Sequence, residues 1–403
     1  MHTHRIPSHR QLLLLALGVS LTTVVISGEI LCRVWLALAR HKAYYLTAPF
    51  FKRGQAPLVD YRLDVDDLHA DAAPAGPKRH RRGERGPTWY FKLKPGAYPP
   101  PPPYTYPHYT INRLGFRGRD FDPQPPPGVH RVICIGESST FGAESPDDQT
   151  WPARLEHHLN RAGRGAFEVI NAGFVAYESQ NYLNLVQQEL LAYRPEFFII
   201  YAGVNDLNVE PNFEVQPATA LMREIHGRLY YGWSMLYTVV MERVYEAVKQ
   251  SVVSSVVHRR HATEHFARNL NALMELAQAR GVRCVVVRQM IYSPAALFTR
   301  DEVSVEEALA QQRTATPPPP GNGNYADPYT VVRLAELMQA ARQVCQARHV
   351  PMVDVRPAML AALQQAHEPY FLDYVHLTPT ANDRFAQLLV PHILTASAAS
   401  AGQ

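Results

Sequence analysis

The sequence predicts an α/β domain in which helices cover both faces of a parallel sheet. The main observation is that apolar runs of strand length alternate with amphipathic segments of helix length from residue 131 onward. A second is a helix start signal near residue 378, and a third is an apolar content of 46%, enough for a sizeable core. The expected strands are residues 131–135, 167–170, 197–201, 282–287 and 351–355.

Expected helices follow at residues 150–161, 180–193, 264–280 and 329–348. The last helix has the clearest start, because Thr378 can cap its first turn and Pro379 suits its first position. Insertions interrupt the alternation at residues 208–261 and 304–327. The first insertion follows the third strand, where loops of a parallel sheet surround the ligand crevice, so we expect a lid or a membrane-facing flap.

The N-terminal stretch predicts a membrane anchor. Residues 11–28 carry no charge, and a bilayer core needs about 20 apolar residues in a helix. Glu29 and Arg33 stand four positions apart, so they can pair on one helix face. A cleaved signal peptide is the alternative, but its apolar region is typically about 7–15 residues. The short tail before a large domain favours placement of that domain outside, in the periplasm or extracellular space.

Three parts follow from these patterns. Residues 1–40 are the tail and anchor, and residues 41–130 are an irregular Pro-rich segment with a short strand within 109–118. Residues 131–396 are the α/β domain.

Composition argues against several other classes of protein. The net charge of +4 is small, and the basic run at 78–82 lies among Pro and Gly, typical of a solvated loop, so no nucleic-acid partner is expected. Cys32, Cys134, Cys284 and Cys345 match neither a zinc site nor a disulfide framework, so we expect free buried thiols. The histidines lack ligand partners at metal spacing, and neither a metal nor a cofactor is expected.

Two polar motifs follow the first and last predicted strands and suit nucleophilic catalysis. Gly136-Glu-Ser-Ser-Thr-Phe-Gly142 follows the first strand, and its glycine allows a tight turn that presents a hydroxyl at the edge of the sheet. Asp373-Tyr-Val-His376 precedes the last helix, so the Asp373 carboxylate can reach Nδ1 of His376 and leave Nε2 facing a cleft.

Two further motifs can supply hydrogen-bond donors to an oxyanion. Asn171-Ala-Gly-Phe-Val-Ala176 follows the second strand, and its Gly173 can offer a backbone N–H. Gly203-Val-Asn-Asp206 follows the third strand, where the amide of Asn205 is well placed to donate. Each motif alone is an ordinary turn; together, in this order, they predict a serine-hydrolase site.

Over residues 131–391, these four motifs resemble those of the SGNH (GDSL-like) hydrolase family. The resemblance implies a three-layer flavodoxin-like fold and an esterase that needs no cofactor. It implies Ser138 as the nucleophile, His376 as the base and Asp373 as its orienter. It also implies an oxyanion hole of the Ser138 N–H, Gly173 and Asn205. The segment 111–118 looks like one found ahead of the first motif in membrane-anchored bacterial members.

Three residues depart from the family pattern. Glu137 stands where aspartate is commoner, which should affect loop bracing, and Ala176 and Ala381 replace glycines. Ser139 is the rival nucleophile by adjacency. We expect a small ester or an acylated glycan as substrate. An O-acyltransferase for an envelope or extracellular polysaccharide, a lipase-like acylhydrolase and a tethered binding module with a degenerate site are the alternatives.

Overall fold

The computed structural model describes residues 20, 23–24, 26–31, 33–34, 92–93, 95–98, 109–163, 165–208, 256–319 and 322–398. The chain forms two compact units, residues 1–60 with 212–253 and residues 61–211 with 254–403. Most of the predicted insertion at 208–261 and the basic run at 78–82 lie outside the described residues.

A five-stranded parallel sheet forms the centre of the second unit, and this confirms the predicted fold class. Its order is β4-β3-β5-β6-β7, which in chain order is the 2-1-3-4-5 arrangement of flavodoxin-like sheets. The strands are β3 (Val129–Gly136), β4 (Ala166–Gly173), β5 (Phe197–Tyr201), β6 (Arg283–Val287) and β7 (Met352–Val353). Strand β4 extends beyond its predicted end, so Asn171 and Gly173 belong to the strand.

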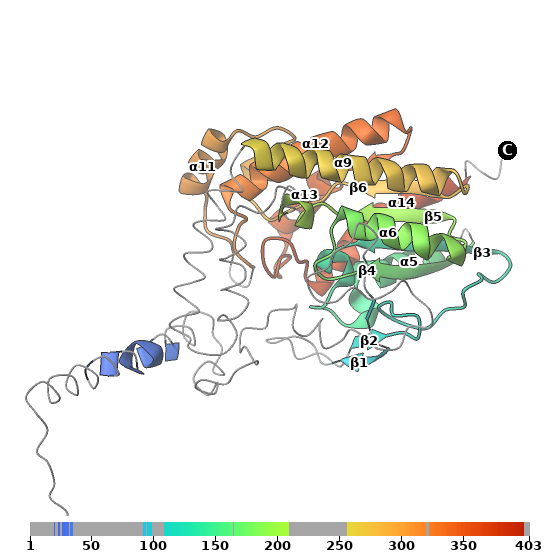
Figure 1. Ribbon diagram of the computed structural model, residues 1–403, viewed down its shortest axis with the longest axis horizontal. Helices are drawn as coiled ribbons and strands as arrows, with labels where there is room; N and C mark the ends of the chain where they lie inside the picture. The colour runs from blue at the N-terminus through green and yellow to red at the C-terminus, as the bar shows by residue number, and fades with distance from the viewer. Residues whose placement is uncertain are drawn as a thin grey trace, which may run out of the picture. The chain divides into compact units, whose positions relative to one another are not determined.

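Helices cover both faces of this sheet because successive strand residues point to opposite sides. Ile133 and Ile135 of β3 join one buried cluster, whereas Val132 and Cys134 join the other. The first cluster includes residues of α6 (Ser179–Gln188), α9 (Val256–Gln278) and α12 (Pro328–Ala347). The second includes residues of α5 (Trp151–Arg161), α13 (Arg356–Gln365) and α14 (Pro379–Ala398). Figure 1 shows α9 and α12 side by side.

The helix ends follow local capping rules. Asp327 accepts a hydrogen bond from Thr330 N at 3.0 Å and Pro328 begins α12. Thr378 Oγ1 accepts a hydrogen bond from Ala381 N at 3.3 Å, which confirms the predicted start of α14. Helices α11 (Val305–Thr314) and α13 were not expected from the sequence. The remaining short elements are β1 (Gly96–Tyr98), β2 (Tyr109–Ile111), α4 (Ser138–Phe141), α10 (Ala295–Phe298) and the 3-10 helices Asp147–Gln149, Leu190–Tyr193 and Asn205–Asn208.

The segment 109–118 is ordered, as predicted, and it lies against the edge strand of the sheet. Strand β2 pairs antiparallel with β1, and Arg117 forms an antiparallel bridge to Asn171 of β4. Asn112 Oδ1 accepts hydrogen bonds from the backbone of Leu114 and Phe116, both at 3.0 Å, and closes the turn between them. The segment therefore delivers the Arg117 side chain to the region that follows β3.

In the first unit, residues 26–31 and 33–34 are helical, and Arg33 Nε donates to Glu29 Oε1 at 2.9 Å. This confirms the expected ion pair. Among the described residues, no helix combines the length and the apolar character that crossing a membrane requires. Cys134, Cys284 and Cys345 are free and buried, as expected, while Cys32 lies outside the described residues.

Candidate active site

The turn from β3 to α4 places Ser138 at the carboxyl end of β3. A Cβ atom at Gly136 would lie 2.1 Å from Thr140 Oγ1 and 2.4 Å from Tyr201 O, so only glycine fits there. Glu137 continues in an extended conformation and Ser138 begins α4. In a flavodoxin-like sheet, β3 and β5 flank the switch point at which the chain changes direction, and ligands bind there.

The structure brings Ser138, His376 and Asp373 into one hydrogen-bonded chain. His376 Nε2 lies 2.8 Å from Ser138 Oγ, and His376 Nδ1 lies 2.6 Å from Asp373 Oδ2. The other carboxylate oxygen of Asp373 accepts hydrogen bonds from the backbone N–H groups of Val375 and His376, at 2.7 and 2.8 Å. The Oγ atom of Ser139 is buried and has no hydrogen-bond partner among the described residues. The geometry therefore favours Ser138 over Ser139 as the serine in contact with the histidine.

Charged neighbours set the protonation of this chain. Burial lowers the pKa of His376, but the charge of Glu144 and the hydrogen bond and charge of Asp373 outweigh burial and raise it to about 9. Burial acts to raise the pKa of Asp373, but the hydrogen bond from His376 prevails and lowers it. Asp373 therefore stays ionised and holds the imidazole with Nδ1 protonated and Nε2 toward the serine.

Gly173 is used for packing, in contrast to the oxyanion role expected from the sequence. Its N–H donates to Asn171 Oδ1 at 3.0 Å, so this hydrogen is already engaged. A Cβ atom at Gly173 would lie 2.3 Å from Phe141 N, which explains the need for glycine where β4 packs against α4. Three residues later, Ala176 lies exposed in the turn before α6 with φ of 62°, a left-handed conformation more usual for glycine.

Asn205 lies at the carboxyl end of β5, beside the turn that carries Ser138. Its Nδ2 donates one hydrogen to Tyr177 O at 2.8 Å. The amide nitrogen carries a second hydrogen, which points away from Tyr177 O. Glu137 holds this loop, because its Oε1 accepts hydrogen bonds from Gly203 N at 2.6 Å and Asn205 N at 3.2 Å. Burial raises the pKa of Glu137 to about 7 against the opposing effect of these backbone donors. Glu137 therefore braces the loop that carries Asn205.

Glu144 is a site residue that the sequence analysis missed. Its Oε1 lies 3.8 Å from His376 Nδ1, and only 3% of its side chain is exposed. Burial raises the pKa of Glu144, and His376 and Arg117 act in the opposite direction. A glutamate two positions after Gly142 forms no recognisable motif, so only the fold reveals its position.

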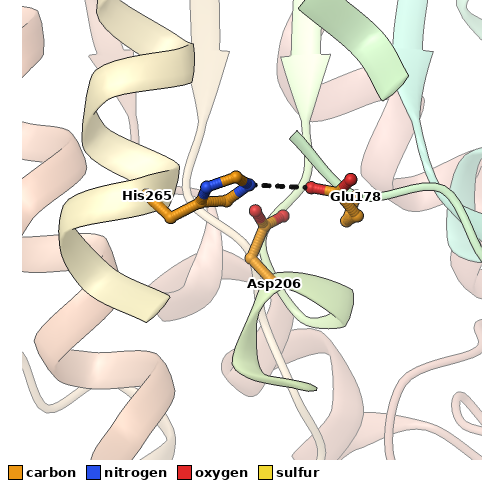
Figure 2. Close-up of side chains that lie close together, drawn as sticks. All are labelled: Glu178, Asp206 and His265. Carbon is orange, nitrogen blue, oxygen red and sulfur yellow. Dashed lines mark hydrogen bonds and ion pairs between the residues drawn. The ribbon is translucent and has the colours of Figure 1, made fainter. Parts of the chain in front are cut away.

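A second cluster of titratable side chains lies behind the Asn205 loop. Glu178, Asp206 and His265 point toward one another in Figure 2, and their nearest ligand-type atoms all lie within 4.8 Å of one another. His265 Nε2 lies 3.2 Å from Glu178 Oε2, and the N–H and hydroxyl of Ser179 both donate to Asp206. No metal site was expected from the sequence, and of the described side chains these three come nearest to one. The His265–Glu178 contact links α9 to the start of α6, and the bonds from Ser179 to Asp206 link α6 to the loop that carries Asn205.

A flavodoxin-like sheet with a serine, histidine and aspartate joined by hydrogen bonds at its switch point has the architecture of a serine hydrolase. Residues 134–384 match the GDSL-like Lipase/Acylhydrolase family, and the chain belongs to this family. It is accordingly a hydrolase that acts on esters. No curated protein matches the sequence.

Several solved structures are similar to this chain at low sequence identity. A lipase/acylhydrolase from Enterococcus faecalis is 17% identical, with a TM-score of 0.37, covering 66% of this chain and 95% of its own. An acetyl xylan esterase, AlAXEase, is 12% identical, with a TM-score of 0.39, covering 65% of this chain and 99% of its own. A mutant of an acetyl-xylooligosaccharide esterase from Geobacillus Stearmophilus is 14% identical, with a TM-score of 0.39, covering 66% and 94%.

Replacement of Glu137 tests its role in holding the Asn205 loop. Glu137→Ala leaves the N–H groups of Gly203 and Asn205 without their acceptor, and each orphaned buried donor costs about 1–3 kcal/mol. We expect a lower free energy of unfolding in urea and a reduced kcat for p-nitrophenyl acetate. Glu137→Gln keeps a carbonyl oxygen in place and should retain most of both. Equal stability of the alanine variant and the wild type would contradict the bracing role.

Proposed function

We propose that the chain is a serine esterase in which Ser138 attacks the ester carbonyl, His376 acts as the base and Asp373 orients the imidazole. The observation that carries this proposal is the continuous chain of hydrogen bonds from Ser138 Oγ through His376 to Asp373. Such a chain removes the proton from a hydroxyl that is otherwise a weak nucleophile.

The reaction proceeds in two halves. Ser138 Oγ forms a bond to the carbonyl carbon as its proton moves to His376 Nε2. The bond from that carbon to the alkoxy oxygen then breaks, and His376 returns the proton to the departing alcohol. In the second half, water attacks the acyl-serine with His376 again as base, and the acid leaves as Ser138 regains its proton. The residues present supply every proton transfer.

The oxyanion of each half-reaction needs aligned donors near Ser138. We propose the Ser138 N–H and the second amide hydrogen of Asn205, with the N–H of Ala176 in place of that of Gly173. Support comes from the engaged N–H of Gly173 and from the exposed, left-handed turn at Ala176. The variant Asn205→Ala tests the side-chain donor. We expect its kcat to fall while its KM does not rise.

An ester on an envelope or extracellular glycan is the substrate class that we favour. The charge-free stretch at 11–28 supports this, because an anchored domain outside the membrane meets such glycans. A lipase-like acylhydrolase is the alternative, favoured by the aromatic and apolar residues between 229 and 257. Turnover of p-nitrophenyl esters of increasing chain length separates the two, since an acetyl preference supports the glycan ester and a preference for long acyl chains supports the lipid.

Replacing the two adjacent serines tests the assignment of the nucleophile. We expect Ser138→Ala to abolish ester turnover, because His376 then has no hydroxyl to deprotonate. Ser139→Ala should keep most of the activity, since the hydroxyl of Ser139 contacts no described polar group. A serine-reactive fluorophosphonate followed by peptide mapping checks both. Labelling of Ser139 in the Ser138→Ala protein would overturn the assignment.

Water or another hydroxyl can resolve the acyl-serine, and the second outcome would make the chain an O-acyltransferase. The insertion begins directly after the 3-10 helix Asn205–Asn208, so it starts beside the site. Charged side chains occur among its apolar residues, typical of a surface flap rather than a seal against water. These are Arg223, Arg228, Glu242, Arg243, Glu246 and Lys249.

We therefore expect hydrolysis to dominate when an acyl donor is mixed with excess glycan acceptor in water. Quantifying free acid and acylated glycan in one reaction gives the ratio directly, with the Ser138→Ala protein as the blank. More acylated glycan than free acid would favour the transferase.

We also propose that residues 1–40 anchor the enzyme in a membrane with the α/β domain on the outer side. Full-length protein should sediment with membranes and resist extraction by high salt, whereas a chain that begins at residue 41 should stay in the supernatant. Fractionation followed by N-terminal sequencing measures this. Mature protein with an N-terminus near residue 40 in the soluble fraction would show a cleaved signal peptide instead.

A further inference from the structure

We propose that Glu144 is a second carboxylate of the active site, which stabilises the charged form of His376 during turnover while Asp373 orients the ring. The inference rests on the proposed roles of Ser138 and His376. It concerns a residue that lies outside the four sequence motifs. The charge of Glu144 affects the reaction only through His376. Glu144 is therefore a positioning residue and not a catalytic one.

The geometry separates the two carboxylates by function. Asp373 lies within hydrogen-bonding distance of His376 Nδ1, but 46% of its side chain is exposed to solvent. Glu144 Oε1 lies 3.8 Å from the same nitrogen, too far for a hydrogen bond, and its side chain is only 3% exposed. Solvent screens a charge on Asp373 more than a charge on Glu144, because the effective dielectric constant falls with burial. Glu144 thus influences His376 by charge alone.

Arg117 fixes the loop that carries Glu144. Its guanidinium group donates to Gly142 O at 2.8 Å and to Ser145 O at 2.6 Å, on either side of Glu144. The same group pairs with Asp147 Oδ1 at 3.0 Å, and its side chain is 1% exposed. Such a buried, multiply bonded guanidinium leaves the loop little freedom to carry Glu144 away from the histidine.

A second contact joins this loop to the histidine side of the site. Asn382 Nδ2 of α14 donates to Ser145 Oγ at 3.1 Å, and α14 begins directly after the loop that holds His376. Both ends of the Glu144–His376 contact are therefore attached to the same helix.

The charges around His376 favour its protonated form. Three carboxylates face it: Asp373 from its own loop, Glu144 from the loop after α4, and Glu137 from the turn after β3. The hydroxyl of Ser138 lies 2.8 Å from the other ring nitrogen, Nε2. Glu137 is engaged with the backbone of Gly203 and Asn205. Burial raises the pKa of Glu144, and the charges of His376 and Arg117 oppose that shift and favour the ionised carboxylate.

The direction in which the Glu144 charge shifts the pH dependence of activity follows from the proton transfer to His376. In the transition state His376 carries the proton of Ser138, so an ionised Glu144 lowers the energy of that state relative to the resting one. The same charge raises the pKa of the free histidine, and the enzyme becomes active only above that pKa. Loss of the Glu144 charge should therefore shift the acid limb of activity to lower pH and reduce the plateau rate.

The test uses the full-length chain and the variant Glu144→Gln, which removes the charge and keeps the shape. The rate of labelling by a fluorophosphonate and kcat/KM for p-nitrophenyl acetate are measured from pH 5 to pH 10. We expect the midpoint of both acid limbs to fall by about 1 unit or more in the variant, as for the loss of an opposite charge at this distance. The KM should change little. Glu189→Gln, a carboxylate bonded to Lys92 and Tyr193, is the matched control and should leave the midpoint unchanged.

Further variants distinguish charge from folding. Glu144→Asp keeps the charge and should keep a midpoint close to that of the wild type, even if the rate falls. In Asp373→Asn, the buried Glu144 remains, so the midpoint should stay above 6.5, the ordinary pKa of histidine. A midpoint at or below that value would overturn the inference even if Glu144→Gln failed to fold.

The outcomes also separate this inference from the proposed function. Wild-type protein that takes no label and hydrolyses no ester would overturn the esterase assignment, and this inference with it. Wild-type protein that is labelled and active, with the same midpoint in Glu144→Gln, would overturn only the role of Glu144.

Discussion

Parallel pairing of β3 with both β4 and β5 is the constraint on which the site depends. In this register Gly136 lies opposite Gly173 on one side and Tyr201 on the other, so three loops leave the sheet at the same level. The first loop carries the serine, the second the exposed turn before α6, and the third Asn205. Because a side chain at Gly136 or Gly173 would collide with the neighbouring backbone or with Thr140, close approach of these loops requires glycine at both positions.

Buried carboxylates connect the loops once the sheet has brought them together. Glu137 is fully buried and spans from the serine turn to the loop after β5, while Asp206 binds Ser179 at the start of α6. A buried acid is costly unless its oxygens are hydrogen-bonded. Backbone N–H groups satisfy Glu137 Oε1 and both oxygens of Asp206, whereas Glu137 Oε2 has no partner among the described residues. The hydrogen bonds that compensate for this cost also fix the relative positions of the proposed catalytic groups, so stability and preorganisation share the same contacts.

Sequence reasoning located the strands and the polar motifs because both depend on local pattern. Strand β5 has the predicted bounds, and the serine, histidine and aspartate meet as the order of the motifs suggested. What the sequence could not reveal depends on tertiary contact. Gly173 resembles an oxyanion donor until the bond to Asn171 is seen, and Glu144 becomes part of the site only when the loop after α4 lies beside His376 and α14. Helix α11 was missed because its Pro-rich flank dominated the local composition.

The site also extends beyond the part of the chain that the family shares. The family match begins at residue 134, yet Arg117 supplies the contacts that hold the loop around Glu144. Arg117 reaches this loop because its own backbone pairs with Asn171 on the open edge of β4. The segment 109–118 thus covers an edge strand of the sheet and, through Arg117, holds the loop that places Glu144 near His376. The proposed site therefore draws part of its support from a segment that precedes the first strand of the parallel sheet.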